Sequence, residues 1–418
     1  MEKAKRRYVW ALGMAGLGRN VGWGMNKVFT AALLGSLQAS TGLIGAVLGV
    51  EGLFGLILNP LSGYFSDRFG TRLGRRRPYL FVAFPGAAIT LMLMYLTRSL
   101  GVAITAIVLF YFFQQLSPTP YQAMMPDSID EHSYGEASGI LNLLWSVGNL
   151  IAFLIIPVVF LYVGHIAGFG LGALLLLAGG LWTAFAAKEK PQAAKGPSER
   201  LDFGPLVTGP LLKYYVAQGL WWLGFEAIAS FFTPYMIHVL HGSQLDSGLG
   251  MAIFTIPAIL VALWFGKLYQ RHDPRLLLSL TLALFALSAI NGLWLNSVTE
   301  AFLLLFVAGI AWGGIQVTSY PLAADMLRQA LLQRGLSEES AQREGALLHG
   351  ALYGGANLVQ SVGLMVAAPL AGFVIHAAHG QYQTMFIVCV ASLIAALGLV
   401  LLFGRVEVAA PAQHLTTP

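Results

Sequence analysis

Three charged side chains lie deep inside long apolar stretches of a chain that carries few charges. Of its 418 residues, 57% are hydrophobic and 10% are charged, yet Arg19, Glu51 and Glu226 are each surrounded by apolar sequence. A charge at the middle of a membrane helix costs about 2.5 to 3.5 kcal/mol on insertion scales. Each of these groups therefore needs a partner, or a function such as binding a solute or carrying a proton.

Arg19 and Glu51 have similar predicted depths. Arg19 is about eleven residues into the first apolar stretch and Glu51 about ten residues into the second, which brings both close to the midplane of a membrane. We therefore expect them to form an ion pair, which either holds two helices together or takes part in solute or proton binding. Lys27 lies further along the first stretch, where its side chain either reaches the membrane surface or lines water.

Glu51 and Glu226 are the only Asp or Glu residues well inside the predicted spans, so both are candidates for proton coupling. A nearby cation favours the ionised form of a carboxylate, as expected for Glu51 beside Arg19. Glu226 has no basic residue nearby in the sequence, and desolvation there favours the neutral acid that a proton carrier must be able to form. We predict Glu226 as the proton site and Glu51 as the partner of Arg19.

Polar and aromatic residues recur at helical spacing within the apolar stretches. Arg19, Trp23 and Lys27, for example, follow steps of four residues and share one helix face. Aromatic faces beside amides suit stacking on and hydrogen bonding to a polyhydroxyl solute, although such residues also serve packing and hydrogen bonds between helices. The predicted solute-binding residues are Arg19, Asn20, Trp23, Gln114, Gln115, Tyr121, Asn142, Asn149, Trp222, Trp312, Gln316, Tyr353 and Asn357.

The stretches that carry these residues are long enough to cross a membrane as helices. A hydrocarbon core about 30 Å thick needs about 20 residues of helix, and soluble domains usually contain roughly 25% charged residues. We therefore expect an all-α membrane protein embedded in a lipid bilayer. Twelve transmembrane helices are predicted, at 8–34, 41–65, 78–97, 101–125, 137–163, 167–187, 211–239, 247–270, 275–296, 299–326, 345–377 and 380–404.

Cysteine, histidine and motif content argue against several kinds of chemistry. The single cysteine, Cys389, cannot form an internal disulfide or a cysteine metal cluster, and the nine histidines follow no HExxH or comparable pattern. The sequence also lacks a phosphate-binding loop and a nucleophile elbow, which argues against ATP-driven transport and membrane enzymes. We expect no metal, no cofactor and no enzymatic activity.

Basic residues gather on one side of the predicted spans. All but three of the 24 Lys and Arg residues lie in the tails or near the loops after the second, sixth, eighth and tenth helices; the exceptions are Arg19, Lys27 and Arg98. Positive residues near span ends mark the cytoplasmic face. The net charge of +5 is therefore a topology signal and does not indicate nucleic acid. We expect both termini in the cytoplasm and the protein in the inner or plasma membrane.

The chain contains a weak internal repeat. Glu136 and Asn149 in the fifth predicted helix have the same separation as Glu344 and Asn357 in the eleventh. Between the two repeats lies a polar segment rich in Pro and Gly, which has the composition of a linker. The predicted organisation is a six-helix bundle at 1–187, a cytoplasmic linker at 188–210, a second six-helix bundle at 211–404 and a cytoplasmic tail at 405–418.

The most charged loop, residues 62–80, has the sequence SGYFSDRFGTRLGRRRPYL. It resembles the signature of the major facilitator superfamily in the form found in plant sucrose transporters and their animal and bacterial relatives, and it is similar to the glycoside, pentoside and hexuronide symporter group. The resemblance implies the major facilitator fold, with two six-helix pseudo-repeat bundles around a site at the midplane. It also implies a gating motif formed by Gly63, Asp67, Arg68, Gly70, Gly74, Arg75, Arg76 and Arg77.

The resemblance also assigns a function to this loop. It implies that Asp67 lies under the N-terminal end of the eleventh helix while the cytoplasmic gate is closed, because free amide donors and the helix dipole favour an anion there. Arg68 and the arginines after Gly74 are then expected to hold neighbouring cytoplasmic carboxylates.

The fourth predicted helix departs from the sucrose branch. That branch has an Asp followed eleven residues later by an Arg, and these positions fall here on Tyr111 and Gln122, so both charges are missing. Gln114 and Gln115 do correspond to the pair of amides in that branch. The resemblance therefore implies a transporter and leaves its solute and coupling ion open.

Together these features predict a secondary active transporter that moves a small polar solute, such as a sugar or glycoside, by cation-coupled alternating access. The expected coupling cation is a proton, and we expect a monomer. One alternative is an efflux antiporter for amphipathic drugs or metabolites, which the aromatic content also permits. Another is a non-transporting receptor or assembly protein that has kept the fold. Saturable, gradient-driven flux separates transport from the receptor alternative.

Overall fold

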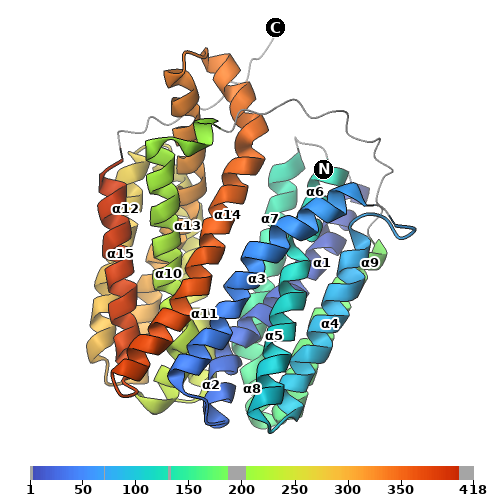
Figure 1. Ribbon diagram of the computed structural model, residues 1–418, viewed down its shortest axis with the longest axis vertical. Coiled ribbons are helices and arrows are strands. Elements are labelled where there is room, and N and C mark those ends of the chain that lie inside the picture. The colour runs from blue at the N-terminus through green and yellow to red at the C-terminus, as the bar shows by residue number, and fades with distance from the viewer. Residues whose placement is uncertain (1–2, 70, 130–132, 187–203, 404–418) are drawn as a thin grey trace.

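The computed structural model describes residues 3–69, 71–129, 133–186 and 204–403, and the elements in these ranges are helices (Figure 1). The first half contains α1 (Lys3–Met25), η1 (Asn26–Thr30), α2 (Ala31–Ser36), α3 (Thr41–Arg68), α4 (Arg77–Leu96), α5 (Leu100–Leu116), α6 (Pro118–Ser128), α7 (Tyr134–Leu150), η3 (Ile151–Ile155), α8 (Ile156–Tyr162) and α9 (His165–Ala186). The second half contains η4 (Gly204–Val207), α10 (Gly209–His238), α11 (Gln244–Tyr269), α12 (Pro274–Asn291), η5 (Gly292–Trp294), α13 (Val298–Gln333), α14 (Glu338–Ala377), η6 (Tyr382–Thr384) and α15 (Met385–Leu401).

Each of the twelve predicted stretches coincides with one helix or a run of helices. Ten of the described helical segments are long and apolar enough to cross a membrane by length and composition. The two long segments outside this group of ten are the first, from α1 to α2, and α10. These two segments carry Lys27 and Glu226 respectively, two of the buried charged residues.

The tenth and eleventh spans extend beyond their predicted bounds of 299–326 and 345–377. α13 continues without a break to Gln333, and α14 begins at Glu338, so both helices extend beyond their apolar parts. The turn between them contains Gly335 with a φ of 89°, a conformation that glycine adopts without strain. An ion pair of 2.5 Å between Arg328 and Glu338 joins the two helices beside this turn.

Three spans are interrupted. The fourth is divided at Ser117, where Pro118 begins α6 because a proline cannot donate the backbone hydrogen bond that continues a helix. The first and fifth spans contain the π-helical segments η1 and η3. Such wide turns inside α-helices occur frequently at functional sites.

Two groups of six spans form the molecule (Figure 1). In the first half α1 packs against α7 and α9, and in the second half α10 packs against α14 and α15. Side chains at Gly18 and Gly148 would collide with the backbone of the facing helix, so these glycines permit the close approach of α1 to α9 and α7. Most of the predicted linker and all of the predicted tail lie outside the described residues, and the domain boundaries stay a prediction.

The two halves contact each other toward one end of the molecule. The arginine end is where α3 finishes at Arg68, and the opposite end is where α3 starts at Thr41. α3 and α14 meet where Gly45 approaches Ala368 and Gly52 approaches Met365, both in the half of α3 nearer the opposite end. α11 also contacts η3. In Figure 1 the ribbons of α3 and α14 converge at the bottom and diverge toward the top, where the N-terminus lies.

Candidate functional site

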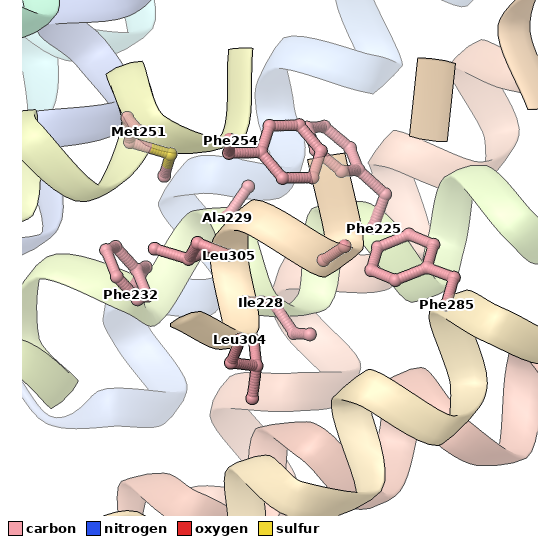
Figure 2. Close-up of a pocket in the computed structure, with 10 residues that line it drawn as sticks. Phe225, Ile228, Ala229, Phe232, Met251, Phe254, Phe285, Leu304 and Leu305 are labelled. Atoms are coloured by element: carbon pink, nitrogen blue, oxygen red, sulfur yellow. The ribbon is translucent and has the colours of Figure 1, made fainter. Parts of the chain in front are cut away.

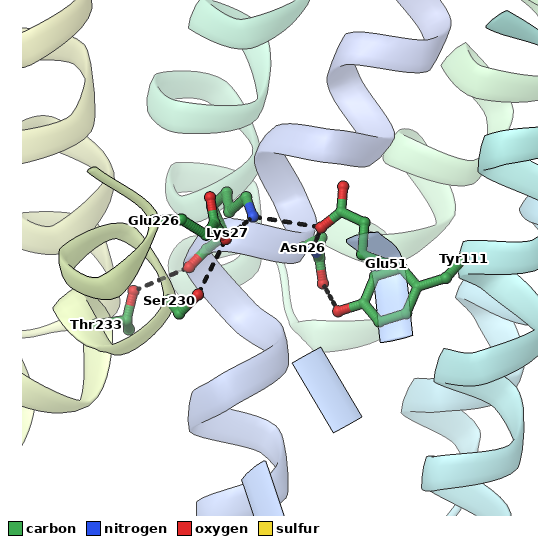
Figure 3. Close-up of polar contacts among 7 residues, drawn as sticks. All are labelled: Asn26, Lys27, Glu51, Tyr111, Glu226, Ser230 and Thr233. Atoms are coloured by element: carbon green, nitrogen blue, oxygen red, sulfur yellow. Dashed lines mark hydrogen bonds and ion pairs between the residues drawn. The ribbon is translucent and has the colours of Figure 1, made fainter. Parts of the chain in front are cut away.

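Lys27 is the centre of a buried group of charges between the two halves. It lies in η1 on the first span, and 4% of the residue is exposed. Its Nζ is 3.3 Å from Oε2 of Glu51 on α3, and it forms a second ion pair with Oε1 of Glu226 on α10. Both glutamates are buried, and Figure 3 shows Lys27 between them. One cation thus contacts a carboxylate from each half.

Neutral hydrogen-bonding groups surround these charges (Figure 3). Asn26 Nδ2 donates to Glu51 Oε2 over 3.3 Å, and the Tyr111 hydroxyl donates to Asn26 Oδ1 over 2.8 Å. On α10, the Ser230 hydroxyl donates to Glu226 Oε1 over 2.9 Å. Because buried polar groups cost free energy unless they are hydrogen-bonded, these neighbours hold the charged groups in place. We call this set, Asn26, Lys27, Glu51, Tyr111, Glu226 and Ser230, the Lys27 network.

The backbone of η1 adds a further link to the second half. The Thr233 hydroxyl on α10 donates to the Lys27 carbonyl oxygen over 3.5 Å and lies 2.6 Å from the Ser247 hydroxyl on α11. The first span is therefore connected to α10 by both its side chain and its main chain.

The prediction that Arg19 and Glu51 form an ion pair is wrong. Among the described residues no carboxylate contacts the Arg19 side chain, and Glu51 is bound by Lys27 and Asn26 instead. The reason is that Lys27, and not Arg19, lies at the depth of Glu51 when both are counted from the opposite end. Lys27 lies nine residues before the end of α2 at Ser36, and Glu51 lies ten residues after the start of α3 at Thr41, so the two are level.

Two further expectations about buried charges also need correction. Lys27 does not extend to the membrane surface, since it is buried between two carboxylates. Glu226 does have a basic neighbour, namely Lys27, which is 199 residues away in the sequence. Lys27 becomes a neighbour of Glu226 only through tertiary packing, so the residues close to Glu226 in the sequence did not indicate this partner.

Sequence reasoning also missed Asn26, Tyr111 and Ser230 as members of the network. Ser230 is one helical turn from Glu226, a spacing that places both side chains on one face. Tyr111 occupies the position at which the sucrose branch has an aspartate, so the departure from that pattern marked a residue that contacts the network. Asn26 carried no comparable signal.

Arg19 lies about two helical turns before Lys27, and none of the described carboxylates contacts it. The residue is half-buried, its Nε is buried without a hydrogen-bond partner, and its carbonyl oxygen accepts from Gln114 Nε2 over 3.4 Å. Asn149 Oδ1, on the neighbouring α7, is also buried without a partner. Trp23 lies between Arg19 and Lys27, and its ring is 5.2 Å from Lys27 Nζ. This part of the first half has polar atoms that a bound solute could satisfy.

The other predicted residues of the first half have different surroundings. Gln115 is buried, and the Tyr121 hydroxyl accepts from Trp145 Nε1 over 3.3 Å. Asn20 Nδ2 donates to its own helix, at the Gly16 carbonyl oxygen, over 2.8 Å. Asn142 is exposed. Asn20 and Tyr121 thus already have hydrogen-bond partners within the protein.

In the second half, Trp312 is the centre of an aromatic cluster. The ring of Trp222 lies edge-on at 4.9 Å from it, and that of Phe225 stacks on it at 4.3 Å. Phe225 also lines a small apolar cavity with Phe254 and Phe285 (Figure 2). The cavity has about 20 Å³ of space for water centres, which corresponds to roughly one water molecule. Folding therefore brings the predicted residues Trp222 and Trp312 together from separate spans.

The remaining predicted residues lie nearer the arginine end. Gln316 is half-buried one turn beyond Trp312 on α13. The Tyr320 hydroxyl donates to Asn357 Oδ1 over 3.4 Å, and its ring lies 5.5 Å from that of Tyr353. Within the described part of the chain, none of these residues is hydrogen-bonded to the Lys27 network.

The gating motif is described only in part, because the Asp67 side chain and Gly70 lie outside the described residues. Arg68 donates to the Tyr64 hydroxyl over 2.5 Å and lies over the Tyr64 ring, and none of the described carboxylates contacts it. The expected carboxylate partner of Arg68 is therefore not found in the described part. Gly63 lies where α3 approaches α6, since a side chain there would meet Thr119.

The later arginines of the motif contact the first half. Arg76 is buried and donates to the Ser66 hydroxyl over 3.3 Å, and Arg77 Nε donates to the Ala184 carbonyl oxygen at the end of α9 over 2.6 Å. Gly74 has a φ of 106°, which allows the tight turn before them. Arg76 and Arg77 therefore hold the start of α4 against α3 and α9.

Two overlapping segments of the chain match the same family model. The model of the Major Facilitator Superfamily matches residues 12–337 and 215–417. The chain belongs to this superfamily. It is accordingly an integral membrane transporter with the major facilitator fold, and it is not an enzyme.

Curated relatives of this superfamily member match it over short segments. "Proton-associated sugar transporter A" of Homo sapiens is 32% identical over 82 residues, 20% of this chain and 11% of that protein. "Sucrose transport protein SUT5" of Oryza sativa subsp. indica is 25% identical over 171 residues, 35% of this chain and 32% of that protein. The chain thus spans about a tenth to a third of the length of these relatives.

Solved structures of similar fold cover nearly the whole chain. A bacterial homologue of the human lysosomal transporter Spinster, in an inward-facing and occupied conformation, has a TM-score of 0.74 at 14% identity and covers 96% of this chain and 97% of its own. The nucleoside transporter NupG has a TM-score of 0.72 at 14% identity and covers 95% of this chain and 99% of its own. At these identities the likeness concerns the fold.

Proposed function

We propose that this transporter moves a small polar solute, such as a sugar or glycoside, together with a proton by alternating access. The observation that carries the proposal is Lys27 paired with a carboxylate from each half, Glu51 and Glu226. Ionisable groups inside a membrane are costly and mark ion or proton paths. Glu51 and Glu226 are acids that can bind a proton. Glu226 also forms the ion pair that joins the two halves.

Glu226 is the proton site in this proposal. Ionised Glu226 attracts Lys27 and stabilises the contact of α10 with η1 near the opposite end. Protonation removes this attraction, which is stronger in a low-dielectric interior than in water. The opposite end then opens more easily, so binding of a proton favours the state that exposes the site there. Glu51 continues to neutralise Lys27 in both states.

We further propose that the arginine end faces the cytoplasm of the inner or plasma membrane, because basic residues near span ends favour that side. The conformation is then inward-facing, since the halves meet toward the opposite end. The bundles 1–187 and 211–404 rock against each other in a monomer. A sugar is supported by the amides and aromatic rings described above and by the names of the two curated relatives.

Transport assays on the full chain in proteoliposomes test this function. With radiolabelled sugars and glycosides and an imposed proton gradient, the wild type is expected to concentrate its solute. Glu226→Gln, which cannot bind and release a proton, is expected to lose at least about 90% of this accumulation and to keep solute exchange. Glu339→Gln changes an exposed carboxylate and is the matched control. Normal accumulation by Glu226→Gln would contradict the proposal.

The efflux alternative rests on one observation, the apolar cavity that Phe225 lines (Figure 2). Its volume of about 20 Å³ is far below the several hundred Å³ of a typical drug-sized site, so we favour a polar solute. The direction of flux distinguishes the two, because an antiporter moves its solute against the proton. Absence of saturable flux for all solutes would favour the receptor alternative.

A further inference from the structure

Arg19 is a cation inside the membrane for which the described residues supply no contacting anion. Neither an ion pair nor a side-chain hydrogen bond of Arg19 is found among them, and its Nε is buried. A guanidinium offers several donors in a planar fork that fits a carboxylate, so an unpaired one is a ready anion-binding group.

A count of the buried charges indicates that the anion for Arg19 is a bound solute. Arg19 and Lys27 are balanced formally by Glu51 and Glu226, but both carboxylates contact Lys27 and leave Arg19 alone. A proton on Glu226 leaves the core with one excess positive charge. A neutral solute would leave that excess unchanged, whereas a monoanion bound at Arg19 would cancel it. Because a net charge in a low-dielectric core is costly, the monoanion gives the more stable loaded state.

The groups near Arg19 suit a solute with hydroxyls as well as an acid. Gln114 is buried against the main chain of Arg19, and Asn149 Oδ1 on the facing helix is buried without a donor. The ring of Trp23, one turn away, offers an aromatic face. An acceptor without a partner favours a solute that donates, such as an alcohol, while the guanidinium favours an oxyanion.

We propose that Arg19 binds the carboxylate of a monoanionic polyhydroxy acid, which enters with the proton carried by Glu226 in an electroneutral step. This inference rests on the proposed function and names its substrate class. The proton and the acid cross together without net charge. A neutral sugar carried with one proton would instead move one positive charge across the membrane.

Binding to the purified full chain tests the role of Arg19. The probes are two pairs that differ at one carbon, D-gluconate with D-glucitol and D-glucuronate with D-glucose, measured by calorimetry or intrinsic fluorescence. We expect the wild type to bind at least one acid about tenfold or more tightly than its neutral partner, a difference of about 1.4 kcal/mol. Arg19→Gln should abolish this preference and Arg19→Lys should keep most of it. Arg343→Gln, at an exposed arginine, should match the wild type.

Flux measurements keep the outcomes distinct. Uptake of the acid with an inward proton gradient should be insensitive to a membrane potential imposed with potassium and valinomycin. Proton-driven uptake of a neutral sugar alone, or an unchanged acid preference in a folded Arg19→Gln protein, would overturn this inference and leave the proposed function standing. Normal accumulation by Glu226→Gln would overturn the proposed function instead. Elution of each variant as one monodisperse peak shows that it is folded.

Discussion

Lys27 of η1 and Glu226 of α10 form a buried ion pair that joins the two halves of the transporter. The lysine belongs to the first span and the glutamate to the seventh, the two long helical segments outside the ten most apolar ones. The fold thus brings the first and seventh spans into contact. Because a second carboxylate, Glu51, also binds Lys27, loss of one ion pair need not leave the lysine without a counter-ion.

Removal of Lys27 should destabilise the protein strongly. Lys27→Met leaves two buried carboxylates without their cation, and breaking a buried ion pair in this way costs about 3 to 5 kcal/mol. The double variant Lys27→Met/Glu226→Gln should recover part of this loss, because one unpaired charge is removed. Thermal unfolding in detergent measures both, with Arg343→Met as an exposed control. Equal melting temperatures for the single variant and the wild type would mean that Lys27 is not paired in the native state.

The Tyr111 hydroxyl should stabilise the site through Asn26. Tyr111→Phe leaves Asn26 Oδ1 without the donor that now lies 2.8 Å away, and an unsatisfied buried acceptor costs about 1 to 3 kcal/mol. We expect lower thermal stability and slower proton-driven uptake, since Asn26 also positions Glu51. Tyr162→Phe removes an exposed hydroxyl and should change neither property.

A larger side chain at Gly52 should separate the halves near the opposite end. A Cβ at this position would meet the backbone of α14 at Ser361 and Met365, which cannot move aside like a flexible side chain. Gly52→Val is therefore expected to shift the protein toward the state that is open at the opposite end. The distance between spin labels at positions 41 and 376 should increase by several ångströms, about the space that a larger side chain adds between two packed helices. Gly398→Val faces open space in a helix and is the control.

The orientation proposed for the arginine end can be tested with two single cysteines. Gln333 and Gln381 are both exposed and lie beside loops at opposite ends of the molecule. In right-side-out vesicles, an impermeant maleimide should label Gln381→Cys and spare Gln333→Cys. The native Cys389 is buried with 0% exposure, so its background should be low. The reverse pattern of labelling would invert the topology and the direction of coupling.

The twelve spans and their bounds could be predicted from the sequence because they depend on local properties. Apolar length decides which segments enter a membrane, and polar and charged residues near the span ends indicate where they stop. The family also has a local signature in the loop around Arg68 and Arg77. The exception was the segment after Met326, where α13 continues to Gln333 beyond the predicted end of the tenth span.

Only the buried charges of the candidate site could be found from the sequence, and their pairing was decided by tertiary structure. The sequence indicates that Glu51 and Glu226 are buried acids and that Arg19 and Lys27 share a helix face. It does not show which cation lies at the same depth as which acid. The depth of each charged residue depends on where its span begins, and for Lys27 also on the π-helical turn at Asn26. An ion pair requires contact within a few ångströms, whereas a depth counted along two helices is uncertain by more than a turn. The packing of α3 and α10 around η1 therefore placed both carboxylates beside Lys27, and among the described residues it left Arg19 without a carboxylate in contact.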